Sequence, residues 1–200
     1  MTAGLLPAVL KSFRAVQPNV RMRVTAMETP RQLQSLGDGV IDVGLIRSRT
    51  YYPDGVIARI VQRERLMIAL ATDHPLARHK TLKPAQLRGQ PFISPQFSEM
   101  GGFAEYLTHL GRIGGFDGKP EYEVIDFITA ISMAAAGYGV VLVPESIKAF
   151  APLGLTFKKI SDFDDEAPLA LAYRARERSP CVKAFVSSVL SLYKVSEGRG

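Results

Sequence analysis

Hydrophobic residues near the start of the chain recur at two spacings, one typical of helices and one typical of strands. Apolar side chains at positions i, i+3, i+4 and i+7 predict a helix over residues 6–16 that packs on a sheet. Over residues 20–26 apolar and polar residues alternate, which predicts a half-exposed strand. Thr29 and Pro30 then suit the N-cap and the first position of a helix, and residues 41–46 predict the next strand. These elements would form one βαβ unit.

The alternation of helices and strands continues through the rest of the chain. The apolar run over residues 66–71 predicts a buried strand, and the glycine-rich residues 111–119 predict a loop. The other predicted elements are strands at residues 91–94, 121–125, 140–143 and 169–173, and helices that begin near residues 103, 126 and 182. Alternating elements favour parallel sheets with crossover helices, so the pattern predicts an α/β fold.

The stretch from Ala134 to Ser146, AAAGYGVVLVPES, is the most informative one in the chain. Residues 130–136 are apolar apart from Ser132 and predict a buried helix, and Gly137 suits the left-handed residue that ends many helices. Residues 140–143 predict a strand covered on both faces. Pro144 has no N–H to donate to a neighbouring strand, so it is expected to end the pairing.

This stretch resembles the "aaGxGixlvPxs" signature of the effector-binding domain of LysR-type transcriptional regulators. Further blocks resemble that family in its order along the chain. They are GLLP at residues 4–7 with QPNV at 17–20, LQSLGDGVIDVG at 33–44, and ERLMIALATDHPLA at 64–77. Because the blocks are ordered and spread over most of the chain, the resemblance rests on more than one short motif.

The resemblance implies a fold like that of type II periplasmic binding proteins, with two Rossmann-like α/β lobes joined by two crossover strands. Lobe I is expected to hold residues 1–71 and 168–200, and lobe II residues 72–167. Regulators of this family begin with a winged helix-turn-helix and a linker helix, which have no counterpart in this sequence. The first strand of the family's effector domain has no counterpart either.

Composition narrows the class of protein further. The hydrophobic content of 46% suffices for a sizeable core, and no apolar run is long enough to span a bilayer. The single cysteine, Cys181, excludes an internal disulfide framework and fits the reducing cytoplasm. The net charge of +6 is dispersed, with short concentrations at residues 78–80 and 174–178, and is interpreted as solvated surface rather than a nucleic-acid interface. We therefore expect a cytoplasmic protein without a membrane segment.

Three predicted helix starts could face a ligand. In open α/β sheets ligands bind beyond the carboxyl ends of strands, where the unpaired N–H groups of helix N-termini suit carboxylates. These starts are Thr29, the segment of residues 94–103, and Asp126 with Phe127. Arg47 follows a predicted strand and could supply a cation for a carboxylate. Asp126 would repel an acidic ligand unless its carboxylate caps the helix.

By resemblance, the family's effector pocket lies between the lobes and uses these same positions. The expected effector-binding residues are Thr2, Thr29, Arg47, Ser94, Pro95, Ser98, Gly102, Phe103 and Phe127. Plainer interpretations stay open for four of them. Thr29 would then only cap its helix, Arg47 would be a surface charge, and Phe103 and Phe127 would be ordinary core residues.

No group of residues predicts catalysis or metal binding. The nucleophile-elbow pattern G-x-S-x-G does not occur, and the three histidines are not spaced as metal ligands. His74 is interpreted as a turn residue. Residues 162–166 are acidic but lack the glycine and the distal glutamate of a calcium loop, so they are interpreted as a solvated loop. We expect no enzyme activity and no cofactor.

The resemblance thus implies the sensor domain of a LysR-type regulator. A small organic acid, possibly aromatic, would bind between the lobes and alter the geometry of a homodimer or tetramer. Promoter DNA would be contacted only through the winged-helix domain, and no membrane would be involved. The alternative is a periplasmic solute-binding protein that serves a transporter, because that class shares the fold.

Overall fold

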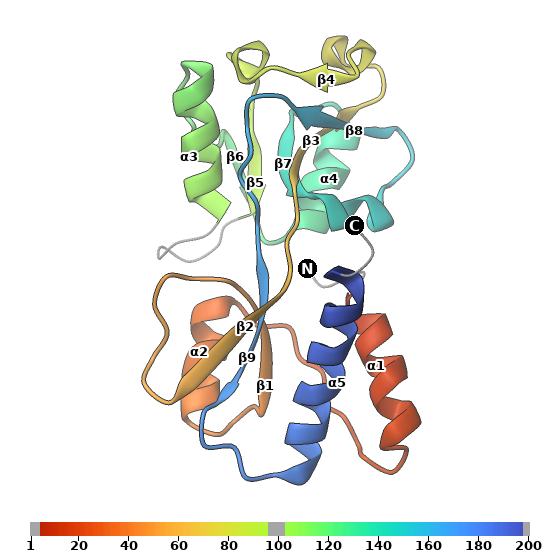
Figure 1. Cartoon of the computed structure of the whole chain (residues 1–200). Coiled ribbons are helices and arrows are strands. Elements are labelled where there is room, and N and C mark those ends of the chain that lie inside the picture. Colours follow the sequence, from red (N-terminus) through yellow and green to blue (C-terminus); the bar gives the residue numbers. More distant parts are fainter. Residues whose placement is uncertain (1–4, 96–102, 198–200) are drawn as a thin grey trace. The chain divides into compact units, whose positions relative to one another are not determined.

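The computed structural model describes residues 5–95 and 103–197, with side chains as far as residue 193 (Figure 1). The chain forms two compact units. Unit 1 spans residues 64–167, and unit 2 combines the residues before 64 with those after 167. The chain therefore passes from unit 2 to unit 1 between Arg63 and Glu64, whereas the predicted boundary between the lobes followed residue 71. The reason is that the strand at residues 66–71 pairs with strands of unit 1.

Unit 2 is built on a three-stranded sheet. Its elements are α1 (Leu5–Val16), α2 (Thr29–Gly37), β1 (Val43–Arg47), β2 (Val56–Gln62), β9 (Leu169–Arg174) and α5 (Pro180–Glu197). The strand order is β1-β9-β2, and β9 is antiparallel to both neighbours. The parallel pairing expected from the alternation of elements is therefore wrong in this sheet, because the chain returns along β9 in the opposite direction.

Alternate residues of β9 divide the core of unit 2 into two parts, since successive strand side chains point to opposite faces. Leu169 and Leu171 belong to the cluster formed with α1 and α5. Ala170 and Ala172 belong to the cluster formed with α2. Figure 1 shows α1 and α5 side by side on one face of the sheet and α2 on the other. β9 thus contributes leucine side chains to the layer with α1 and α5, and alanine side chains to the layer with α2.

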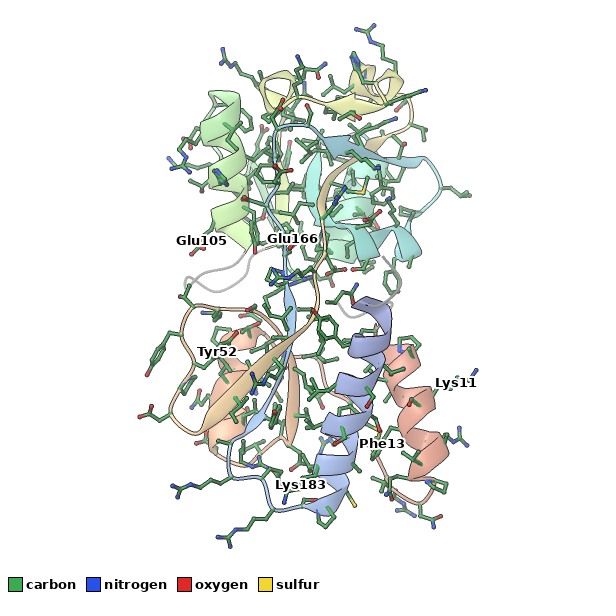
Figure 2. The ribbon with its side chains drawn as sticks, viewed as in Figure 1. Lys11, Phe13, Tyr52, Glu105, Glu166 and Lys183 are labelled. Carbon is green, nitrogen blue, oxygen red and sulfur yellow. The ribbon has the colours of Figure 1, made fainter. Side chains whose placement is uncertain are left out.

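α5 is an 18-residue amphipathic helix whose apolar face packs on α1. The rings of Phe185 and Phe13 meet edge to face, with their centroids 5.2 Å apart. Figure 2 shows Phe13 directed toward α5 and Lys11 directed away from it. Within residues 5–95 and 103–197, no helix combines the length and apolarity needed to cross a bilayer.

The strand predicted over residues 20–26 is not formed. These residues have no regular secondary structure, and residues 21–26 are exposed. Alternation specifies two faces, but a strand also needs a neighbouring strand that satisfies its N–H and C=O groups. No strand in the described part of the chain pairs with this segment, so the predicted βαβ unit is wrong.

Unit 1 is built around β3 (Leu66–Ala71), whose six residues are all buried and which lies at the position that the sequence predicted. Its sheet has the order β4-β8-β3-β7, and a separate pair is β5-β6. The other elements are β4 (Thr81–Leu82), β5 (Ile93–Pro95), α3 (Phe103–Gly114), β6 (Tyr122–Val124), α4 (Phe127–Ala135), β7 (Val141–Pro144) and β8 (Leu155–Ile160), with 3-10 helices at Pro75–Arg78, Pro84–Leu87 and Glu145–Phe150.

Pairing in unit 1 is mixed, which again differs from the predicted parallel sheet. β3 is antiparallel to β7 and β8, whereas β4 is parallel to β8 and β5 is parallel to β6. A parallel bridge also joins Phe92 to Val140. α4 packs on β3 and β5 and ends at Ala135, with Ala136 as its C-cap. Gly137 follows the cap, and its positive φ of 83° is the left-handed conformation predicted for it.

The glycine-rich stretch predicted as a loop begins inside a helix. α3 continues to Gly114, so Gly111 is a helical residue. A Cβ on Gly111 would lie 2.6 Å from the backbone nitrogen of Gly118, and one on Gly118 would lie 2.3 Å from the carbonyl oxygen of Leu107. These glycines therefore allow the following loop to lie directly on α3.

Candidate functional site

The start of α2 and the end of β1 meet through two of the predicted site residues. The backbone N–H of Arg47 donates to Oγ1 of Thr29 at 3.2 Å. The predicted N-cap role of Thr29 is wrong, because the N-cap is Glu28, in extended conformation and without a side-chain cap bond. Thr29 is instead the first helical residue, and its hydroxyl is used by the neighbouring strand.

Gln32 fastens the same edge of β1 one helical turn further along. Its Nε2 donates to the carbonyl oxygen of Met27 at 2.8 Å and to that of Leu45 at 3.2 Å. A Cβ on Gly44 would lie 2.8 Å from Gln32 Oε1, so the strand leaves room for this amide. Side chains of α2 thus hydrogen-bond the backbone N–H of Arg47 and the carbonyl oxygen of Leu45 at the edge of β1.

Sequence reasoning did not identify Gln32. Its spacing of three residues from Thr29 places both on one face of the helix, and that spacing was the available signal. The pattern cannot show which backbone groups the face will meet, because that depends on where β1 lies.

The turn after β1 is held by Tyr52, which sequence reasoning also missed. The N–H of Arg49 donates to Tyr52 Oη at 2.9 Å, and the hydroxyls of Tyr52 and Ser48 are hydrogen-bonded at 3.1 Å. The N–H of Ser48 donates to the carbonyl oxygen of Pro168 at 2.9 Å. The backbone N–H groups of Arg47, Ser48 and Arg49 are therefore all hydrogen-bonded within unit 2.

Arg174 is a structural residue rather than the solvated charge that was expected for residues 174–178. Its guanidinium donates to the carbonyl oxygen of Ile41 at 2.7 Å, to Asp42 at 2.9 Å and to Glu177 at 2.7 Å. Burial lowers the pKa of Arg174, but the hydrogen bonds to the two carboxylates outweigh it and raise that pKa above its usual value. The pKa of Glu177 is lowered by the N–H of Ser179 and, against the effect of burial, by Arg174.

Four of the predicted residues that the structure describes lie in unit 1. Ser94 and Pro95 end β5, and Ser94 Oγ donates to the carbonyl oxygen of Pro95 at 3.4 Å. The rings of Phe103 and Phe127 meet edge to face, with their centroids 4.8 Å apart. These rings are only 5% and 4% exposed and belong to the core of unit 1. The structure therefore brings the two aromatic residues together inside the core.

Asp126 is the N-cap of α4. Its Oδ1 accepts the N–H of Thr129 at 2.8 Å, so the carboxylate is engaged with its own helix. Asp126 was expected to repel an acidic ligand unless its carboxylate capped the helix, and it does cap the helix. Thr2, Ser98 and Gly102 lie outside the residues that the structure describes.

The histidines have structural partners. His74 Nδ1 accepts the N–H of Leu76 at 3.1 Å and its Nε2 bonds Gln90 at 3.1 Å, so its predicted turn role is confirmed. His109 on α3 bonds Asp165 at 2.6 Å, which ties down part of the acidic segment expected to be a solvated loop. Among the residues with described positions, no three His, Cys, Asp or Glu side chains are grouped to hold a metal.

Comparisons with known proteins agree with the resemblance seen in the sequence. The sequence model of the LysR substrate binding domain family matches residues 1–193. The regulator BenM of Acinetobacter baylyi is 27% identical over 192 residues, which cover 95% of this chain and 63% of BenM. The Hca operon transcriptional activator HcaR of Escherichia coli is 27% identical, over 93% of this chain and 62% of HcaR. The chain spans less than two thirds of the length of either relative.

A solved structure of the BenM effector-binding domain with its effector benzoate is similar in fold. The TM-score is 0.84 at 25% identity, over 98% of this chain and 88% of that one. The predicted fold class, an α/β fold like that of type II periplasmic binding proteins, is therefore confirmed. The relatives do not favour the alternative of a transporter's solute-binding protein, because they are transcriptional regulators.

Proposed function

Because the chain belongs to the LysR substrate-binding domain family, we propose that it is the sensor part of a transcriptional regulator whose effector is a small organic acid. The observation that carries this proposal is the junction of α2 and β1, where the Thr29 hydroxyl binds the Arg47 backbone. Benzoate, the effector of BenM, is an acid of the proposed class.

The junction suits a carboxylate for three reasons. Glu28, the N-cap of α2, makes no side-chain cap bond, and a helix start carries partial positive charge. The oxygen of Thr29 accepts the Arg47 N–H, so its own hydroxyl hydrogen can be donated to an anion. Arg47 adds a cationic side chain at the same junction.

The other proposed effector contacts that the structure describes belong to unit 1. Ser94 and Pro95 end β5, and Phe103 and Phe127 begin α3 and α4. Phe103 and Phe127 are buried in the core of unit 1 and stay predicted contacts of the ligand. Thr2, Ser98 and Gly102 remain predicted contacts.

We further propose that the chain acts by binding, without catalysis, in the cytoplasm. Effector binding would shift the balance between two arrangements of the protein, as far as the ligand prefers one of them. Promoter DNA would be contacted by a winged-helix domain of the whole regulator.

A second copy of the chain is the proposed protein partner, forming a homodimer or tetramer through the outer face of α1. A surface depression of about 430 Å³ on this face is lined by Leu10, Lys11, Arg14 and Ala15. Residues 5–27 contain no acidic residue, so every charged side chain in this stretch is basic. The proposed contact on the second copy is unit 1, where Ile125 beside Asp126 is 82% exposed.

Thermal unfolding against a panel of aromatic and aliphatic acids, with their neutral amides, tests the effector class. An acid at about 100 times its dissociation constant adds roughly 2.7 kcal/mol and raises the midpoint by several degrees. The expected result is a concentration-dependent rise for acids only. A rise for neutral compounds alone would contradict the proposal.

Thr29→Val tests the residue that carries the proposal. The substitution removes the hydroxyl, so we expect acid binding to weaken by about 1–2 kcal/mol. Thr25→Val is the matched control, since Thr25 is exposed and has no regular structure. Equal affinities in the two variants, measured by calorimetry, would remove Thr29 from the site.

A further inference from the structure

Tyr52 connects the core of unit 2 to the turn that carries Arg47. Its ring is half-buried and packs on the cluster of Leu33, Leu36 and Ile46, between α2 and the sheet. Figure 2 shows Tyr52 in the loop between β1 and β2. Its hydroxyl accepts the N–H of Arg49 at 2.9 Å and is hydrogen-bonded to Ser48 at 3.1 Å.

Three consecutive backbone N–H groups of this turn are bound by three different parts of unit 2. The N–H of Arg47 is bound by the Thr29 hydroxyl, that of Ser48 by the Pro168 carbonyl, and that of Arg49 by the Tyr52 hydroxyl. Two of these acceptors are side-chain hydroxyls, those of Thr29 and Tyr52. A turn fixed in this way holds two arginines, Arg47 and Arg49, at a set backbone position.

The paired hydroxyls of Ser48 and Tyr52 also provide a donor. Each carries one hydrogen, and the bond between the two oxygens uses only one of them, whichever residue donates. The second hydrogen is available to an acceptor outside the pair. The same turn carries Arg47 and Arg49, so a negatively charged acceptor such as a carboxylate suits it best.

We infer that Tyr52 is a positioning residue for recognition of the effector's carboxylate, acting through the turn of residues 47–49. This inference rests on the proposed function and adds to it the residue that sets the preference for an acid over its neutral amide. A merely structural role would stabilise the fold and affect acid and amide binding alike.

Tyr52→Phe, with Tyr51→Phe as the matched control, separates these roles. Tyr51 is the preceding residue, it is 74% exposed, and no hydrogen bond of its hydroxyl is described. The probes are benzoate and benzamide, which have nearly the same shape and differ in charge. Calorimetry gives both affinities, and hydrogen exchange of the Arg49 amide reports the turn without any ligand.

The expected result for Tyr52→Phe is faster exchange of the Arg49 amide and about tenfold weaker benzoate binding, equivalent to about 1.4 kcal/mol. Benzamide binding should be unchanged, and Tyr51→Phe should match the wild type in every measurement. A Tyr52→Phe variant that keeps the wild-type ratio of benzoate to benzamide affinity would overturn the inference alone. A wild type that binds benzamide as tightly as benzoate would overturn the proposed function and the inference with it.

Discussion

The edge strand β1 and the central strand β3 satisfy their backbone groups in different ways. β3 lies between β7 and β8, and all six of its residues are buried. Among the residues that the structure describes, β1 has a strand on one side only, and on its other side Thr29 and Gln32 of α2 bond its N–H and C=O groups. A strand paired on both sides is suited to stability. An edge met by side chains leaves polar groups that a ligand can also contact.

The central strand predicts the largest effect on stability. Ile68 of β3 is completely buried, so Ile68→Ala leaves a cavity and should cost about 2–5 kcal/mol. Ile113→Ala, on the exposed side of α3, is the control and should cost much less. Chemical denaturation measures both. Similar losses at the two positions would show that β3 is not the stable centre of unit 1.

The edge strand should show a smaller loss that comes from hydrogen bonding. Gln32→Ala leaves the carbonyl oxygens of Met27 and Leu45 without this donor, which we expect to cost about 2 kcal/mol. Gln34→Ala lies on the same helix at an exposed position and should change stability by less than about 0.5 kcal/mol. If the two variants unfold at the same denaturant concentration, the hydrogen bonds of Gln32 contribute nothing to the free energy of unfolding.

The smallest effect concerns pH and the end of β9. Because the folded-state pKa of Glu177 is lowered from 4.5, its contribution is present above that pH and is lost as pH falls through the folded-state value. Glu177→Gln should therefore cost about 1 kcal/mol at pH 7 and progressively less in acid. The measurement is the free energy of unfolding from pH 7 down to pH 3. A cost that stays constant over this range would contradict the assignment of the lowered pKa to Glu177.

The core strand was predictable from sequence and the edge was not. Residues 66–71 form one uninterrupted apolar run, and such a run describes a strand buried on both faces regardless of its partners. Residues 20–26 have an equally regular pattern, but no strand in the described part of the chain pairs with them. Periodicity describes the faces of an element, while pairing depends on residues far away in the chain.

The candidate site shows the same limit. Thr29 and Arg47 were identified by type and position, yet their direct contact follows from the packing of α2 against β1. Gln32 and Tyr52 bind backbone groups. Every residue has similar backbone groups, so the sequence does not show which of them a side chain will bind. Thr29 was predicted one position away from its true place in the helix, because helix starts are poorly fixed by pattern alone.

The central claim is that the junction of α2 and β1 binds the effector's carboxylate. The most direct test is a benzoate titration followed by the backbone amide NMR signals of Thr29 and Arg47, with benzamide as the neutral control. The account predicts that both signals shift and saturate together with benzoate, and do not move with benzamide at the same concentrations. Saturating benzoate shifts confined to other residues, with Thr29 and Arg47 unchanged, would contradict it.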